Sequence, residues 1–266
     1  MGYGDEILAA GQAEVLYRAD PSRRVAIYDL GGNVRDHEMW RGNPAIASRA
    51  EVASGEPVQR LVSAPNARPY IKYPFTAASG WTFRTDWRAR DHVARVYLTD
   101  AEAARGQAAR ETWGPYVLIE PYTVHGNFEW PLERWAGLVA AMPDLTFVQH
   151  THGASRGVVG AHQTGATFRE ACGLALWSSA YVRSESGLSH AASALGVPTV
   201  VLWGGTMNAD VLGGYAKRVD VVDRGPGSPC GSWEYCPHCR AIMRALPVED
   251  VAAALRVALR EERAIA

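Results

Sequence analysis

The sequence predicts an α/β protein built around a parallel sheet. From Tyr116 onward, short apolar segments of strand length alternate with amphipathic segments of helix length. This alternation indicates βα units, whose strands pair in parallel. The chain has 266 residues, of which 47% are hydrophobic, so it can bury the core of one large domain or two smaller ones.

The first half of the chain is less regular. Residues 4–19 predict a helix, because Ile7, Leu8 and Val15 fall roughly on one stripe. Residues 23–30 predict a strand of mixed apolar type. A linker around Gly106 to Gly114 is predicted to divide the chain into two lobes.

The second half has the clearer pattern. Strands are predicted at 116–121, 145–150, 180–184 and 198–205. Helices are predicted at 130–142, 167–180, 188–197 and 248–263. Pro131 suits the first turn of the first of these helices, Thr164 or Thr167 can cap the second, and Gly196 closes the third.

Composition excludes several classes of protein. The net charge of −1 gives no global basic field for nucleic acid or membrane. No apolar run is long enough to span a bilayer, and Asp5 and Glu6 stand where a secretory signal would carry basic residues. Four cysteines in a chain of this length do not make a disulfide framework, so we expect a reducing cytoplasm.

The stretch from Ser184 to Gly205 predicts an anion site. It follows a strand and opens a helix, and Gly187 allows the backbone to approach a ligand closely. Unpaired amides of the first helical turn, at Leu188, Ser189 and His190, would bind phosphate at the positive end of the helix dipole. Added contacts are predicted from the hydroxyls of Ser186 and Ser189 and, toward a sugar hydroxyl, from Glu185. The alternative is an ordinary turn capped by serine, with His190 merely packed.

Several segments together resemble the heptosyltransferase-like glycosyltransferases of family nine. SESGLSHAASALGVPTVVLWGG resembles their donor-site segment, with Glu185 where the family usually has Asp. EPYTVHGNFEWPLERWAGLV resembles their Trp-Pro-x-Glu-x-Trp pattern, and GATFREACGLALWSSAYV the helix between those two segments. The N-terminal GYGDEILAAG resembles their Gly-x-Gly-Asp loop, and CGSWEYCPHCRAIMRALPVEDV a Cys-rich tail of one phage and bacterial branch. The likeness is close over residues 115–255 and weak over 12–110.

This resemblance implies the GT-B fold, with two Rossmann-like lobes and the active site in the cleft between them. Residues 1–110 would form the acceptor-binding lobe, which is small and lacks the usual strand before the glycine loop. Residues 111–266 would form the donor-binding lobe. The implied activity is transfer of a sugar from a nucleotide diphosphate sugar to a hydroxyl acceptor, with inversion and without a cofactor needed for catalysis.

Three alternatives stay open beside that activity. The acceptor is either a saccharide or a modified base in phage DNA, such as hydroxymethylcytosine. The chain can also be a binding module that holds a nucleotide sugar without catalysis. A glycohydrolase or epimerase of similar fold is the third.

The resemblance also implies the donor-binding residues. Relatives often place a Lys just before the Trp-Pro pair, whereas this chain has Asn127, Phe128 and Glu129 there. Phosphate neutralisation would then rest on the helix dipole, His125, Arg156 or Arg183. The predicted donor-binding set is Gly4, His125, Asn127, Arg156, Thr167, Arg183, Glu185, Ser186, Gly187, Leu188, Ser189, His190 and Gly204. Selection of the base is expected at Thr167, Arg169 and the loop 150–165.

Asp5 matches the catalytic Asp of the family and is predicted to take the proton from the acceptor hydroxyl. Glu6 is the adjacent alternative. In the competing interpretation Asp5 is an N-cap and Glu6 an ordinary residue of the first helical turn.

Residues 60–95 carry seven basic side chains against two acidic ones, interleaved with aromatic rings that include Phe75. Such a mixture suits a phosphorylated sugar, a lipid or a nucleic acid with a stacked base. The predicted acceptor-binding set is Arg68, Tyr70, Lys72, Trp81, Arg84 and Trp87. The alternative is that these residues simply cover the surface.

Cys230, Cys236 and Cys239, with His238 between the last two, predict a structural zinc site. A fourth ligand is needed, and His238, Cys172 or a distant His can supply it. The alternative is three reduced cysteines in a loop rich in Gly and Pro.

Overall fold

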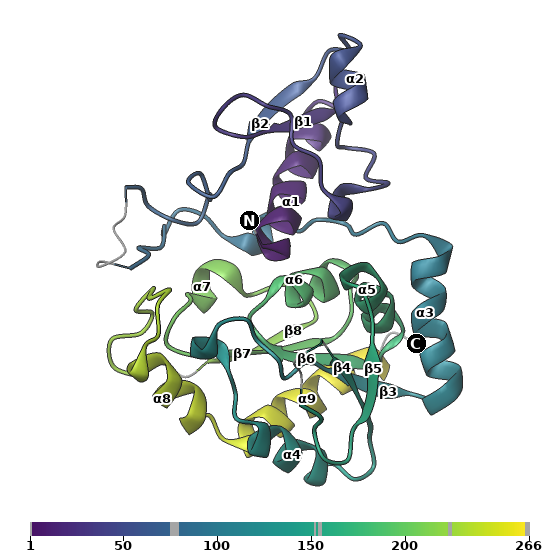
Figure 1. Cartoon of the computed structure of the whole chain (residues 1–266), viewed down its shortest axis with the longest axis vertical. Helices are drawn as coiled ribbons and strands as arrows, with labels where there is room; N and C mark the ends of the chain where they lie inside the picture. Colours follow the sequence, from purple (N-terminus) through teal and green to yellow (C-terminus); the bar gives the residue numbers. More distant parts are fainter. Residues whose placement is uncertain (1, 75–79, 152, 154–155, 223–224, 264–266) are drawn as a thin grey trace.

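The computed structural model describes residues 2–74, 80–151, 153, 156–222 and 225–263. Among these residues the strands form two parallel sheets, one of two strands in the N-terminal part and one of six strands in the remainder. The N-terminal part stands on the layer of helices that covers one face of the larger sheet (Figure 1). The α/β class and the parallel sheet predicted from the sequence are therefore confirmed.

The N-terminal part pairs β1 with β2 in parallel, with Val25 opposite Gln59. Its elements are α1 (Tyr3–Ala19), β1 (Val25–Tyr28), the short helix η1 (Glu38–Trp40), α2 (Arg49–Ala53), β2 (Gln59–Val62) and the short helix η2 (Ala89–His92). The predicted first helix and first strand are confirmed. Most of the remaining residues up to 99 are irregular, as their prolines indicate.

The predicted linker around Gly106 to Gly114 was wrong, because most of it belongs to helix α3 (Asp100–Trp113). Thr99 caps this helix, and Glu102 completes the capping box. A side chain on Gly106 would run into the backbone carbonyl of Gly173 in α5 (Phe168–Trp177). The glycine therefore permits close packing of two helices rather than marking a loop.

The larger sheet has the strand order β5-β4-β3-β6-β7-β8, with every neighbouring pair parallel. Its strands are β3 (Tyr116–Ile119), β4 (Thr146–Thr151), β5 (His162–Gly165), β6 (Ala180–Ser184), β7 (Thr199–Trp203) and β8 (Arg218–Val222). Strand order reverses between β3 and β6. In open parallel sheets of this order, ligands bind beyond the carboxyl ends of the strands at that reversal.

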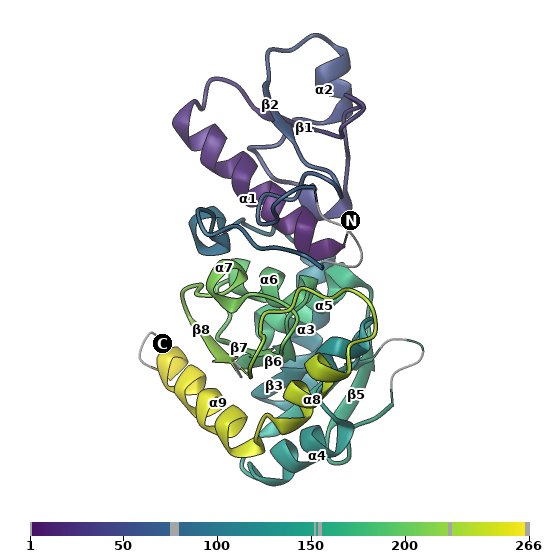
Figure 2. The ribbon, with the colours of Figure 1, turned by 90° about the vertical axis from the view of Figure 1, so that its left-hand side faces the viewer.

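Helices cover both faces of this sheet (Figure 2). They are α4 (Leu132–Ala140), α5, α6 (Gly187–Ala194), α7 (Ala209–Leu212), α8 (Pro237–Ala245) and α9 (Val248–Arg263), with the short helix η3 (Gly126–Phe128). The predicted strands and helices of this half are confirmed within a few residues at their ends. Thr167 is the cap of α5, and Pro131 precedes α4 as its N-cap instead of lying in the first turn.

The hydrophobic core runs without a break from the N-terminal part into the larger sheet. One cluster joins Ile7 of α1 to Leu188 of α6, and a second joins Leu8 of α1 to Trp203 of β7. Helix α1 is thus packed directly against the helices above the sheet. In the part of the chain that the structure describes, no helix has both the length and the apolar character needed to cross a membrane.

Candidate active site

The carboxyl ends of β3 and β6, where strand order reverses, are joined by a buried ion pair. Nη1 of Arg183 lies 2.6 Å from Oε2 of Glu120, and Nη2 donates to the Tyr122 carbonyl at 2.8 Å. Glu120 also accepts from the Tyr181 hydroxyl, and burial, reinforced by this carboxylate, raises the pKa of Tyr181. The terminal nitrogens of Arg183 therefore hold two strand ends together, and its contact with donor phosphate stays a prediction.

The loop after β6 is a capped helix start. Oγ of Ser186 accepts from the Ser189 amide at 3.2 Å, and Oγ of Ser189 donates to the Ser186 carbonyl at 2.7 Å. The His190 amide donates to the Ser186 carbonyl at 3.3 Å. The prediction of three unpaired amides was therefore wrong for Ser189 and His190, whose amides are already bonded within the first turn. The amides of Gly187 and Leu188 belong to the first turn of α6, where the helix dipole is positive.

His190 is buried between two side chains. Its Nδ1 lies 2.8 Å from the Tyr215 hydroxyl, and its Nε2 lies 3.1 Å from Oε1 of Glu185. The imidazole therefore orients the Glu185 carboxylate, which the sequence predicts to bind a sugar hydroxyl. Nothing in the sequence around Tyr215 singled it out, because the contact spans 25 residues of chain.

The two glycine loops of the sequence meet at the starts of α1 and α6. A Cβ on Gly187 would lie 2.8 Å from Cβ of Tyr3 and 2.9 Å from the amide nitrogen of Gly4. A Cβ on Gly4 would lie 3.3 Å from the His190 ring. The absence of both side chains lets the first turn of α1, which carries Asp5, touch the start of α6, which follows Glu185, through their backbones.

Asp5 is held at this junction by two side chains of the basic segment. Arg68 Nε donates to Oδ1 at 3.0 Å, and the Tyr70 hydroxyl donates to Oδ1 at 2.5 Å. Burial raises the pKa of Tyr70, and the carboxylates of Asp5 and Glu185 both add to the effect. The carboxylates of Asp5 and Glu185, which come from segments far apart in the sequence, therefore both act on the Tyr70 hydroxyl.

Glu6 has a different environment from Asp5. Its side chain is 1% exposed and accepts from Nη2 of Arg35 at 2.5 Å. The indole of Trp40 donates to its backbone carbonyl at 2.8 Å. Asp5 directly follows Gly4, which contacts the start of α6, whereas the Glu6 carboxylate is enclosed and paired with Arg35.

Four other residues predicted to bind the donor make bonds or contacts within the fold. The Asn127 side chain donates to the Glu234 carbonyl at 2.7 Å and accepts from the Cys236 amide at 2.9 Å. His125 packs its ring against Trp233, Thr167 caps α5, and Gly204 lies against Met243 of α8.

Arg156, another predicted donor residue, borders open space. It lines a cavity of about 200 Å³ beyond the end of β3, together with Pro121, Tyr122, Thr123, Glu129, Trp130 and Leu132. Within the loop 150–165, predicted to select the base, residues 152, 154 and 155 lie outside the described residues. Arg169, given the same role, is buried and binds both carboxylate oxygens of Glu102, at 2.6 and 2.8 Å, so here it ties α5 to α3.

The predicted acceptor residues divide into buried rings and surface cations. Tyr70, Trp81 and Trp87 are buried in the core cluster that also holds Leu8. Arg84 is paired with Asp86, and Lys72 is exposed. Phe75 lies outside the described residues.

The predicted metal ligands come together. Ligand atoms of Cys230, Cys236, His238 and Cys239 all lie within 4.8 Å of one another. Nε2 of His238 lies 2.6 Å from the Pro226 carbonyl, which leaves Nδ1 to face the thiols, as in metal sites where the second nitrogen is bonded to backbone. Three thiols and one imidazole suit a zinc or iron ion. Cys172 is buried in another core cluster, so His238 and not Cys172 completes the set.

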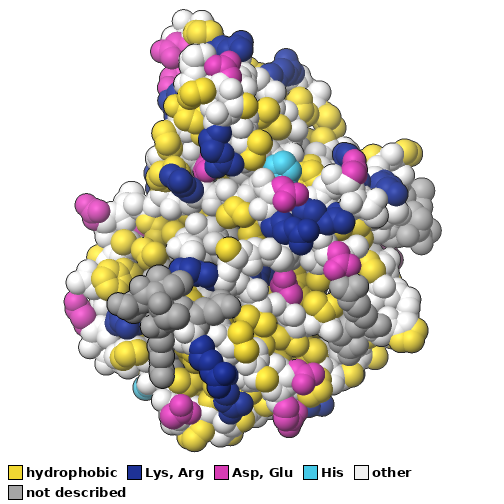
Figure 3. Space-filling model, turned by 180° about the vertical axis from the view of Figure 1, so that it is seen from behind, with side chains coloured by type: hydrophobic (Ala, Val, Ile, Leu, Met, Phe, Trp, Pro, Cys, Tyr) yellow, Lys and Arg dark blue, Asp and Glu magenta, His cyan; other side chains and the backbone are white. Residues whose placement is uncertain are grey.

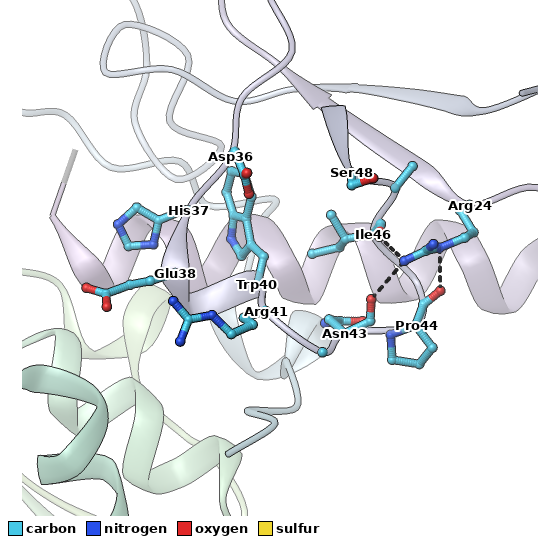
Figure 4. A pocket seen from close by; sticks show the side chains of 12 residues that line it. Arg24, Asp36, His37, Glu38, Trp40, Arg41, Asn43, Pro44, Ile46 and Ser48 are labelled. Carbon is cyan, nitrogen blue, oxygen red and sulfur yellow. Dashed lines mark hydrogen bonds between the residues drawn. The ribbon is translucent and has the colours of Figure 1, made fainter. Parts of the chain in front are cut away.

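Another cavity borders the start of α1, since Glu38 on its wall accepts from the Tyr3 hydroxyl at 2.5 Å. It measures about 550 Å³ and lies beside α1, lined by residues that include His37, Glu38 and Arg41 (Figure 4). Arg24 on its wall donates to the Pro44 carbonyl at 3.0 Å and to the Ile46 carbonyl. The Arg24 guanidinium is therefore bonded to the backbone of the cavity wall and does not point into the cavity together with the other polar side chains that line it.

Comparison with known proteins identifies the fold. No family model matches the chain, and no curated protein matches it. A solved glycosyl transferase of family 9 from Veillonella parvula aligns with a TM-score of 0.68 and 14% identity, over 98% of this chain and 95% of that one. The chain has the fold of this family 9 glycosyltransferase.

Two further structures share the fold. The iron-containing dodecameric glycosyltransferase TibC from enterotoxigenic E. coli aligns with a TM-score of 0.65 and 15% identity, over 98% of this chain and 76% of that one. The E. coli ADP-heptose heptosyltransferase II aligns with a TM-score of 0.50 and 18% identity, over 66% of this chain and 57% of that one. At identities this low, the likeness shows the fold alone.

Proposed function

We propose that the protein is a glycosyltransferase that moves a sugar from a nucleotide diphosphate sugar to a hydroxyl group, with inversion. The observation that carries this proposal is the contact between the starts of α1 and α6. It sets the first turn of α1, which carries Asp5, against a capped helix start at the reversal of strand order, where ligands bind in sheets of this kind. Similarity to a protein named as an ADP-heptose heptosyltransferase supports a nucleotide-sugar donor.

In this proposal the residues 1–110 bind the acceptor and the residues 111–266 bind the donor, with the reaction between them. The first turn of α6 neutralises the leaving diphosphate through its free amides and its dipole. Glu185, oriented by His190, accepts from a hydroxyl of the donor sugar. The cavity beside Arg156 and Thr123 holds another part of the donor.

Asp5 is the base of the proposed reaction. Removal of the acceptor proton while the new bond forms needs a carboxylate within hydrogen-bond reach of that hydroxyl. Arg68 and Tyr70 both donate to this carboxylate, so the acceptor has to displace one of these contacts before the proton moves. Ordinary inversion then follows, because the acceptor attacks from the side opposite the departing diphosphate.

The same two contacts favour a second candidate, a binding module without catalysis. With Oδ1 of Asp5 bonded to both Arg68 and Tyr70, the carboxylate is occupied as a structural group would be. A protein of this kind would bind a nucleoside diphosphate and neither hydrolyse nor transfer the sugar.

The acceptor is proposed to be a saccharide. Of the cations that suggested a DNA acceptor, Arg68 is paired with Asp5 and Arg84 with Asp86. Acidic and basic side chains are interspersed over the described surface seen in Figure 3. A phosphodiester backbone needs unpaired cations, so strongly salt-dependent binding of an oligonucleotide would speak against the saccharide.

The decisive experiment compares Asp5→Asn with the parent protein. A thermal-shift screen over ADP, UDP, GDP and CDP first names the base of the donor. Release of the nucleotide from the matching sugar donors is then measured with candidate acceptors. We expect Asp5→Asn to bind the nucleotide normally and to lose transfer by on the order of 10²- to 10⁴-fold. Asp86→Asn, which removes an exposed carboxylate paired with Arg84, is the matched control. Full activity in Asp5→Asn would remove Asp5 from the mechanism, and nucleotide binding without turnover in the parent would favour the binding module.

Cys230, Cys236, His238 and Cys239 are proposed to hold a structural zinc or iron ion. A bound ion would fasten the start of α8 to the loop before it. Metal analysis of the purified protein tests this site independently of the transfer reaction.

A further inference from the structure

An exposed indole lies at the meeting of three segments far apart in the sequence. Trp233 belongs to the segment of residues 225–236, which we call the Cys loop. Its ring stacks on Trp81 with centroids 4.5 Å apart and an interplanar angle of 20°. The His125 ring lies 4.1 Å from it at an angle of 58°. Trp233 remains 43% exposed, whereas Trp81 beneath it is 8% exposed.

The Cys loop is fixed to the fold on both sides of this indole. On one side, the Trp81 amide donates to the Gly231 carbonyl at 3.0 Å. On the other, the Asn127 side chain binds the Glu234 carbonyl and the Cys236 amide. An aromatic surface held this firmly loses little conformational entropy when a ligand binds to it.

A line of contacts connects Trp233 to the proposed base. The Arg68 guanidinium lies over the Trp81 ring, 4.8 Å from its centroid. The same guanidinium forms the ion pair with Asp5. The exposed indole therefore stands two side chains away from the carboxylate that would activate the acceptor.

The chemistry of this surface indicates an uncharged ring as its ligand. Arg68 is committed to Asp5, and the nearby aromatic side chains, Trp81 and His125, pack against the indole rather than presenting charge. A pyranose has an apolar face of C–H groups and a rim of hydroxyls. It can therefore lie flat on an indole while its hydroxyls stay in water.

We propose that Trp233 is the stacking platform for a pyranose ring of the acceptor. This rests on the proposed function and extends it, because it assigns acceptor recognition to a residue of the C-terminal half. Trp81, which the sequence predicts to contact the acceptor, would then serve instead to hold Trp233 in place by stacking on its ring.

The test uses saturation-transfer NMR on the full chain with methyl α-glucopyranoside, methyl α-mannopyranoside and methyl β-galactopyranoside as probes. We expect transfer to the ring C–H protons of at least one probe, loss of that transfer in Trp233→Ala, and retention in Trp233→Phe. The affinity should fall on the order of tenfold, as for loss of one stacked ring. Tyr235→Ala is the matched control, because Tyr235 lies in the same loop, is 75% exposed and contacts Arg240 instead.

Two results would overturn the platform. One is equal transfer in Trp233→Ala and the parent, or none in either. The other is loss of binding to an oligothymidylate in Trp233→Ala while no pyranoside binds, which would mark the indole as a base-stacking surface. Binding of the nucleoside diphosphate is measured on the same proteins. If either of these results is found while both proteins bind the nucleoside diphosphate, the platform fails and the proposed function stands. If the parent does not bind the nucleoside diphosphate, the proposed function itself fails.

Discussion

Gly187→Ala tests whether the contact between the two glycine loops sets up the site. The added methyl group would lie 2.8 Å from Cβ of Tyr3 and 2.9 Å from the Gly4 nitrogen, whereas ordinary contacts begin at 3.4 Å. The starts of α1 and α6 would have to separate by about 0.5 Å. The Gly4 nitrogen is backbone and cannot rotate away, so the shift moves Asp5 relative to the α6 loop.

Overpacking of this kind costs about 1–3 kcal/mol. For a chain of this size that corresponds to a fall in Tm of roughly 2–10 °C. Because Asp5 is displaced from the donor, we also expect transfer to fall more than nucleotide binding, since small misplacements of reacting groups are costly.

The assay combines thermal unfolding, followed by circular dichroism, with nucleotide binding and transfer. Gly165→Ala is the control, because its added Cβ would meet only Thr151 Oγ1, at 3.9 Å. If Gly187→Ala unfolds at the parent temperature and transfers sugar at the parent rate, the loops do not touch as described, and the argument for a site between them is refuted.

Three further predictions concern other parts of the chain. Hydrogen bonding by Arg169 lowers the pKa of Glu102 to about 2, so the stability that the Glu102 carboxylate contributes is present above its unfolded pKa of about 4.5 and is lost as pH falls toward 2. In urea unfolding, Glu102→Gln should therefore cost on the order of 1 kcal/mol at pH 7 and almost nothing near pH 2. An equal cost at the two pH values would contradict this. Removal of metal by a chelator should lower Tm and make three thiols titratable, and adding zinc or iron should restore the original Tm. The Tm of Cys230→Ser should not change with chelator. An unchanged Tm in a parent protein shown to contain metal would argue against a structural ion. Burial raises the pKa of the Cys172 thiol, whereas hydrogen bonds from neighbouring residues lower the pKa of Cys236. Iodoacetamide should therefore label Cys236 well before Cys172 in the metal-free native protein. Mass spectrometry that shows the reverse order would contradict the described burial.

Part of the site could be predicted because it depends on local chemistry. Ser186 caps α6 and Thr167 caps α5, as serine and threonine before a helical pattern indicate. The apolar runs that became β3, β6 and β7 are buried on both faces, and such strands have a strong signal. β5 was missed because His162–Gly165 is a polar edge strand, formed through pairing with β4 rather than by its own composition.

Other assignments depend on contacts between distant residues. The sequence predicts Gly106 in a loop, whereas in the structure it packs against α5. A glycine needed for close helix packing and a glycine needed for a turn cannot be told apart from the residue type alone. His238 joins the thiols only because the turn into α8 brings its ring round to them. Neither outcome is encoded in the spacing of the residues alone.

The sequence by itself determined the alternation of strands and helices, the helix starts and the residue types of the candidate site, since hydrophobic periodicity and capping act over a few residues. Only the tertiary structure decided that Asp5 meets Arg68, 63 residues away, that Glu6 beside it is buried, and that Trp233 rather than Trp81 is the exposed ring. These choices depend on how α1 packs against α6 and how the Cys loop closes over Trp81. Packing of this kind balances many distant contacts at once, so no short stretch of sequence specifies it.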